Sequence, residues 1–238
     1  MTQEIHLGNL RIEIVYKPIK NVHLSVNPPD GRVRIAAPER LSLERLKLFA
    51  ISKLDWIRRQ QVKIREQVRD SEPEYVERES HFVWGKRYLL EVVETQGSPR
   101  IELTYRAMKL YVRPQTSTAR RNEIVEAWYR DLVRAEACPY VLIWQERLGT
   151  KMNRLFVQRM KTRWGSCNPA SRNIRLNTDL AKKPKECLEY LVVHELIHLI
   201  EPSHNERFIA LMDRHLPTWR RSRSLLNRLP LRHEIWEY

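Results

Sequence analysis

The sequence predicts an α+β fold rather than an alternating α/β sheet. Short runs of alternating polar and apolar residues fill the N-terminal half around one long stretch with helical spacing. A second group of strand-like runs then precedes several helix-like segments near the C-terminus. Strands and helices that are grouped in this way are typical of α+β proteins. We place the boundary between a strand-rich N-terminal region, residues 1–116, and a C-terminal domain, residues 117–238.

The N-terminal region is predicted to begin with strands. Residues 11–16 and 32–36 alternate polar and apolar side chains, which is the pattern of half-buried strands. The segment Pro28-Pro-Asp-Gly31 is rich in turn-forming residues and lies just before the second run, so we expect a hairpin there. Residues 41–69 carry apolar side chains at helical spacing and predict one long helix. Further strands are expected at residues 81–84, 87–94, 100–105 and 108–112.

The C-terminal domain is predicted to begin with a helix over residues 118–147. Pro139 falls inside this stretch, where a proline kinks or divides a helix. Three strands are expected next, at residues 155–159, 162–167 and 173–177. Three helices follow them. This order places a small sheet directly before the helices that carry the histidine motif.

The composition is that of a globular protein. Hydrophobic residues make up 42% of the 238 residues, which is enough for a substantial core in one domain or two. The cysteines are few and far apart, which indicates reduced thiols and a cytoplasmic location. The N-terminus lacks the basic start and apolar core of a signal peptide, and no apolar run has the length of a membrane span. We therefore expect neither secretion nor a membrane partner.

The chain is strongly basic, with a formal net charge of +14 and a pI near 10.0. Arginine and lysine recur on three predicted helices, and such a surface attracts nucleic acid, acidic proteins or phosphorylated metabolites. The same residues are equally well explained as solvated helix faces. Both interpretations stay open at this point, and the sequence leaves the oligomeric state undetermined.

The most specific pattern in the chain is His194-Glu-Leu-Ile-His198. Residues four apart on a helix lie about 40° apart around its axis and one turn apart along it, so both imidazoles can reach one metal ion. Glu195 is rotated by about 100° from His194, which suits contact with a water molecule on the open side of the metal. These polar residues lie in an otherwise apolar stretch, where they would be costly to bury without a ligand. The pattern predicts a zinc site with its own general base.

His204 is the expected third ligand. Pro202 disfavours a helical backbone at Glu201, so the first helix should end near that point and the chain should turn. Ser203 with Glu206 predicts a capping box, which would put His204 at the first position of a second helix. Three protein ligands leave the fourth zinc position for water, as a catalytic site requires. The rivals for the third position are Glu201, Glu206 and Asp213.

The other histidines are interpreted as structural, because a lone histidine is more often hydrogen-bonded than metal-bound. They are His6, His23, His81, His215 and His233. His215 is the least secure of these assignments, since it ends the second helix and can approach the site.

Several segments together carry a family resemblance. They are Arg163-Trp-Gly-Ser-Cys167, Leu176-Asn177, and Tyr190-x-x-x-His-Glu-Leu-x-His-Leu199 through His204-Asn-x-x-Phe208. With the Asp-Gly turn, Ala-Pro38 and Trp56-Ile57 in the N-terminal half, the chain resembles the YgjP-like group of zinc metallopeptidases, related to WLM and SprT-type zincins. The resemblance extends over nearly the whole chain.

The resemblance implies a minimal zincin-like catalytic domain with Zn²⁺ as its cofactor. His194 and His198 would come from the active-site helix and His204 from the following segment, with Glu195 as the base. The strands before that helix would flank the cleft and hold an extended peptide by strand addition. Trp164 and Cys167 are interpreted as core residues. Weaker candidates for contacts with substrate are Arg163, Asn177 and Tyr190.

The sequence therefore predicts a zinc-dependent hydrolase that cleaves a polypeptide substrate through a zinc-activated water, with Glu195 as general base. The arginine excess leaves two alternatives, a metal-dependent hydrolase of nucleotide phosphoanhydrides and a protease associated with DNA. An inactive scaffold stabilised by zinc is disfavoured, because a structural site needs neither Glu195 nor an open position.

Overall fold

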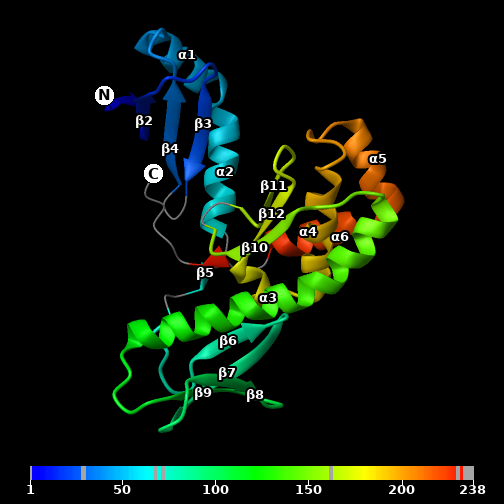
Figure 1. The fold of residues 1–238 in the computed structure, drawn as a ribbon. Coiled ribbons are helices and arrows are strands. Elements are labelled where there is room, and N and C mark those ends of the chain that lie inside the picture. The colour runs from blue at the N-terminus through cyan, green and yellow to red at the C-terminus, as the bar shows by residue number, and fades with distance from the viewer. Residues whose placement is uncertain are drawn as a thin grey trace. The chain divides into compact units, whose positions relative to one another are not determined.

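Figure 1 shows the computed structural model, which describes residues 2–27, 31–66, 69–70, 73–160, 163–228 and 231–232. The chain forms two compact units. The first unit joins Met1–Glu72 with Pro230–Tyr238, and the second unit is Pro73–Leu229. Strands and helices are grouped along the chain, which confirms the α+β class.

A four-stranded sheet of order β1-β2-β4-β3 forms the centre of the first unit. β3 and β4 pair antiparallel, which confirms the predicted hairpin, whereas residues 28–30 of the predicted turn lie outside the described residues. β2 and β4 pair parallel in the middle of the sheet. The strands are β1 (Thr2–Leu7), β2 (Leu10–Tyr16), β3 (His23–Asn27) and β4 (Arg32–Ala37).

Two consecutive helices, α1 (Leu43–Ser52) and α2 (Leu54–Glu66), stand where one long helix was predicted. The break is at Lys53, whose N–H bonds to the carbonyl of Ala50 at 3.1 Å. Both helices contribute to the core of the first unit, which contains Ile12, Ile14 and Ile35 of the sheet with Leu46 and Ile57 of the helices. The apolar spacing continues through the break because both helices turn their apolar side chains to the same core.

The C-terminal segment returns to the first unit. β13 (Leu231–Arg232) pairs parallel with β5 (Arg69–Asp70), which directly follows the α2 region. The first unit is therefore built from both ends of the chain, and the second unit is inserted between them.

The second unit begins with a four-stranded sheet of order β6-β7-β9-β8. Its strands agree with the predicted ones in number and approximate position. They are β6 (Ser80–Val83), β7 (Lys86–Glu94), β8 (Arg100–Leu103) and β9 (Ala107–Val112). Helix α3 (Thr118–Leu148) runs along this sheet (Figure 1).

This first sheet of the second unit shares one core with α3. Leu90 and Met108 of the sheet are fully buried in the same cluster as Val125 and Tyr129 of the helix. The Tyr129 hydroxyl also donates to the Phe82 carbonyl at 3.0 Å. For this reason the structure divides the chain between Glu72 and Pro73, whereas the sequence predicts a boundary between residues 116 and 117.

Helix α3 is one continuous helix. The Ser117 side chain caps its first turn, and Gly149 ends it in the left-handed conformation that glycine adopts without strain. Pro139 lies inside α3 and does not divide it. Among the described residues, no helix has both the length and the apolar character that crossing a bilayer requires.

A three-stranded sheet and the C-terminal helices complete the second unit. The sheet has the order β10-β12-β11, with β12 parallel to β10 and antiparallel to β11. Helix α4 contacts α3, α5, α6 and two strands of this sheet, so it lies at the centre of the packing. The elements are β10 (Arg154–Gln158), β11 (Gly165–Asn168), β12 (Asn173–Asn177), the 3-10 helix η1 (Thr178–Lys182), α4 (Lys185–Ile197), α5 (Glu206–His215) and α6 (Trp219–Arg228).

The packing predicts which leucines matter for stability. Leu188 of α4 is 0% exposed, so Leu188→Ala should lower the free energy of unfolding by about 2–5 kcal/mol through a cavity in the core. Leu142 on α3 is 69% exposed, and Leu142→Ala is the matched control, expected within about 0.5 kcal/mol of the wild type. Urea denaturation followed by circular dichroism measures both. Equal midpoints for the two variants would contradict the packing described.

Candidate metal centre

Helix α4 carries His194 and ends at Ile197. His198 follows as its C-cap and keeps helical backbone angles, with φ −63° and ψ −16°. The two imidazoles therefore keep the spacing of one helical turn. Around them α4 is buried in apolar packing, with Leu191 5% exposed and Leu196 fully buried.

The chain turns after His198 and brings His204 back to the helix. The predicted capping box does not form, because Asn205 caps α5 instead and its Oδ1 accepts from the Phe208 N–H at 3.0 Å. The Ser203 hydroxyl donates to Glu201 Oε1 at 2.9 Å. His204 thus lies just before the cap of α5, not at the first position of the helix. The His204 ring nevertheless lies beside that of His194, with 5.0 Å between the ring centroids.

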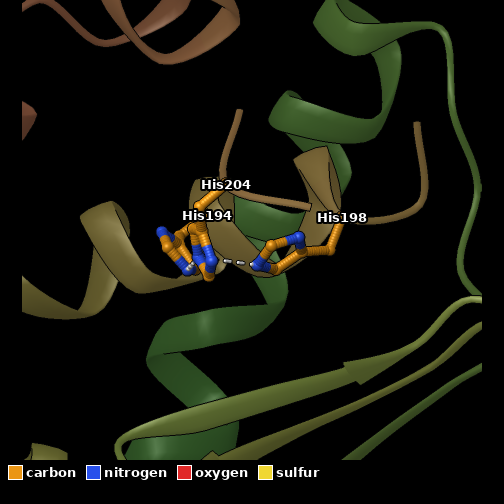
Figure 2. Close-up of side chains that lie close together, drawn as sticks. All are labelled: His194, His198 and His204. Carbon is orange, nitrogen blue, oxygen red and sulfur yellow. Dashed lines mark hydrogen bonds between the residues drawn. The ribbon is translucent and has the colours of Figure 1, made fainter. Parts of the chain in front are cut away.

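The three imidazoles meet at their Nε2 atoms (Figure 2). The Nε2 of His204 lies 3.1 Å from that of His194 and 3.2 Å from that of His198. All three candidate ligand atoms lie within 4.8 Å of one another. Among the described residues, these three side chains form the group that could hold a metal ion.

Hydrogen bonding alone does not account for this arrangement. The His198 Nδ1 lies 3.1 Å from the Glu201 carbonyl, which can only accept, so Nδ1 carries the proton and Nε2 presents a lone pair. His204 Nε2 then faces two nitrogens and can donate one hydrogen to only one of them. Nitrogen ligands of a tetrahedral zinc ion lie about 3.3 Å apart. The separations of 3.1 and 3.2 Å that His204 makes with the other two imidazoles therefore fit a shared metal ion.

Burial favours the neutral form of the two helix histidines. Burial, the larger cause, acts together with the neighbouring His198, His204 and Arg223 to lower the pKa of His194 to about 3. Burial also lowers the pKa of His198, against a raising effect of the Glu201 carbonyl. A neutral imidazole is the form that binds a metal ion.

Phe208 forms the packing surface beneath all three imidazoles. Its ring centroid lies 4.9 Å from that of His194, 4.7 Å from His198 and 4.8 Å from His204. Phe208 is 1% exposed and belongs to the first turn of α5. The sequence motif contains Phe208 but predicts no role for it, although an apolar residue four positions after His204 is the available signal.

The rival ligands are occupied elsewhere or lie outside the cluster. Glu201 accepts from Ser203 and pairs with Arg207 at 3.9 Å. Asp213 accepts from the Trp219 indole at 2.7 Å and pairs with Arg220. Glu206 is outside the group that the described residues form, as are His6, His23, His81 and His215, while His233 lies outside the described residues.

Glu195 is buried beside the cluster, with 4% of its surface exposed. Burial raises its pKa to about 8, against a lowering effect of the Arg163 charge. Its carboxyl lies against Gly165 of β11, where a Cβ atom would meet Glu195 Oε1 at 2.6 Å. Only glycine leaves room for the carboxyl in this position. The spacing of residues along the sequence does not reveal this contact between Gly165 and Glu195.

Of the other residues that carry the family resemblance, Asn177 and Cys167 have structural roles, whereas Tyr190 lies at the site. Asn177 uses its side chain on the backbone: Nδ2 donates to the carbonyls of Met160 at 2.8 Å and Arg163 at 2.9 Å, so it holds the loop before β11. Burial raises the pKa of Cys167 to about 11, which agrees with a core thiol rather than a nucleophile. Tyr190, in contrast, lies beside the metal centre, with its ring centroid 5.7 Å from that of His194.

Comparison with known proteins identifies the family of this chain. No match was found among curated proteins. Among solved structures, the chain is similar to the metallopeptidase zymogen of Pyrococcus abyssi abylysin, with a TM-score of 0.35 and 17% identity over 40% of this chain and 99% of that chain. It is also similar to the metallopeptidase zymogen of Methanocaldococcus jannaschii jannalysin, with a TM-score of 0.32 and 18% identity over 40% of this chain and 86% of that chain. The family model described as YgjP-like, metallopeptidase domain, matches residues 20–229, and the chain therefore belongs to the YgjP-like metallopeptidase family.

Proposed function

We propose that this chain is a zinc-dependent peptidase in which His194, His198 and His204 hold the metal ion and Glu195 is the general base. The observation that carries the proposal is the meeting of three imidazole Nε2 atoms, with separations of 3.1 and 3.2 Å in two pairs, beside the buried carboxyl of Glu195. Membership of a metallopeptidase family supports the same class of reaction.

Zinc suits this set of side chains. Its catalytic sites use three protein ligands, often with nitrogen donors, and keep the fourth position for water or substrate. When bound, the ion polarises the scissile carbonyl and makes a water molecule more acidic. Magnesium and calcium prefer oxygen ligands, whereas this cluster of described residues consists of imidazoles.

Glu195 has the position that a general base needs. It follows His194 directly, so its side chain lies about 100° around α4 from the imidazole. Gly165 bounds it on the side of β11. From there the carboxylate would take a proton from the attacking water and pass it to the leaving amine. Burying a carboxyl group is costly, which supports a role for Glu195 beyond packing.

The sheet beside α4 supports a polypeptide substrate. β11 lies at one edge of the order β10-β12-β11 and contacts α4. An extended peptide that pairs with this edge would run past Glu195, because Gly165 of the same strand contacts its carboxyl.

The cysteines Cys138, Cys167 and Cys187 are free, which supports the proposed cytoplasmic location.

The ligand assignment predicts loss of metal from one variant. His194→Ala should no longer bind stoichiometric zinc, because two imidazoles in place of three hold the ion much more weakly. Elemental analysis of the purified protein measures the zinc content. His215→Ala is the matched control and should keep its zinc, since His215 is outside the cluster. Unchanged zinc in His194→Ala would rule out the assignment.

The proposed base predicts loss of turnover with the metal in place. Glu195→Gln should keep zinc and lose peptide hydrolysis by about 10²- to 10⁴-fold, the usual contribution of a general base. Glu206→Gln, an exposed carboxyl of the next helix, is the control and should retain full activity. The assay screens zinc-loaded protein against unfolded polypeptides and against nucleoside triphosphates. Hydrolysis of the triphosphates alone would favour the phosphoanhydride alternative.

The close approach of β11 predicts that Gly165→Ala is inactive although it binds zinc. The added Cβ would force the Glu195 carboxyl to move, and a displacement of about 1 Å at a reacting group costs about 100-fold in rate. Ser166→Ala is the control, since successive side chains of a strand point to opposite faces. Peptide hydrolysis and zinc content measure the two effects separately. Full activity of Gly165→Ala would contradict the described contact.

A further inference from the structure

Two arginines with no ion pair among the described residues lie beside the metal centre. Arg163 comes from the loop before β11, and Arg223 comes from α6. Both side chains are exposed to solvent. The function proposed above uses neither of them, so their charges are available to a ligand.

Arg223 reaches the centre through a stack of aromatic rings. Its guanidinium carbon lies 5.9 Å from the ring centroid of Trp219, which is four residues earlier on the same helix and therefore on the same face. Trp219 stacks on Tyr190 at 6.3 Å with an angle of 13° between the rings, and Tyr190 lies 5.7 Å from His194. Burial is the main influence that raises the pKa of Tyr190, and the Arg223 charge opposes it.

Arg163 lies on the side of Glu195. It precedes Gly165 by two residues, and Gly165 contacts the Glu195 carboxyl. Asn177 holds the Arg163 carbonyl at 2.9 Å, so the backbone that carries this arginine is fixed at the end of β12. The fixed backbone therefore places Arg163 on the side of the centre on which Glu195 lies.

Three acidic side chains of the surrounding segments already have partners. Asp213 is held by the Trp219 indole and by Arg220, and Glu189 accepts from the Trp144 indole at 3.1 Å. Glu201 is held by Ser203 and Arg207. None of them pairs with Arg163 or Arg223 within the described part of the chain. An anionic ligand would supply the missing partner, because a guanidinium binds a carboxylate with charge-assisted hydrogen bonds.

We propose that Arg163 and Arg223 select acidic polypeptide segments by binding carboxylate side chains on the two sides of the scissile bond. The proposal rests on the proposed peptidase function and names its substrate class. Arg163 is placed near Glu195 by the loop before β11, whereas Arg223 lies at the end of the stack that runs from His194 through Tyr190 and Trp219, so the two arginines approach the centre from different sides. One extended peptide along β11 can therefore meet both charges.

The test uses pairs of peptides that differ only in Asp or Glu against Asn or Gln at positions flanking the cleaved bond. Wild-type zinc-loaded protein should show a kcat/KM about tenfold higher for each acidic residue that meets an arginine, and added salt should reduce this preference. Arg163→Gln should remove the preference for an acidic residue on one side of the cleaved bond. Arg223→Gln should remove the preference on the other side. Both variants should keep zinc, and within each variant the ratio of kcat/KM for the acidic peptide to that for its amide partner should fall by about tenfold on the side that lost its arginine.

The controls remove the same charge elsewhere. Arg221→Gln lies on α6 about 200° around the helix from Arg223, and Arg154→Gln lies on β10. Neither should change the preference for acidic peptides. An equal loss in these controls would overturn the proposal, because it would show a general effect of net charge. Equal cleavage of the acidic and amide peptides by the wild type would overturn it as well.

A binding experiment separates this proposal from the proposed function. Zinc-loaded Glu195→Gln protein is titrated with the same peptide pairs, so that binding is measured without turnover. Tighter binding of acidic peptides that depends on both arginines would support their role even if no peptide were cleaved by the wild type. Binding of nucleoside triphosphates at these arginines with no preference between the peptides would overturn it.

Discussion

A carboxyl group and two imidazoles lie on a helix that is otherwise buried in apolar packing, and each of them must be compensated. Leu188 and Leu196 on α4 are fully buried, so the free energy of burying the apolar side chains holds the helix in place whatever the polar residues do. Neighbouring segments contact these polar groups in different ways, and the buried Nδ1 of His194 has no hydrogen-bond partner among the described residues. The Glu201 carbonyl accepts from His198, and β11 approaches Glu195 so closely that its residue at the contact is Gly165.

Aromatic side chains lower the effective dielectric constant around the three imidazoles. Phe208 lies beneath the three imidazoles, and the stack of Tyr190 and Trp219 covers the side of His194. These rings keep water away from one side of the site, and charges interact more strongly where water is excluded.

Local spacing in the sequence was sufficient for part of this site. The positions of His194, His198 and Glu195 follow from helical geometry, and the spacing of the strands in residues 80–112 followed from alternation. The meeting of His204 with the other imidazoles was predicted through a capping box at Ser203, yet Asn205 forms the cap, since several residues in this short turn have side chains able to do so.

What sequence could not supply were the contacts between distant segments. Neither a glycine nor a proline marks the break at Lys53, so an uninterrupted helix was the natural prediction. The boundary between the units depends on the packing of β6–β9 on α3, which no local pattern encodes. The contact of Gly165 with Glu195 and the stack that leads from His194 to Arg223 also join elements that are separate along the chain.

The hydrogen bond that orients His198 has an evolutionary consequence. Its acceptor is the main-chain carbonyl of residue 201, so it survives any replacement of the Glu201 side chain. The backbone conformation of the turn sets the direction of this carbonyl. Pro202 restricts that conformation because it keeps the preceding residue out of the helical region. Natural variation can therefore change the side chain of residue 201 without loss of this hydrogen bond. The conformation of the turn, rather than that side chain, preserves the orientation of the His198 imidazole.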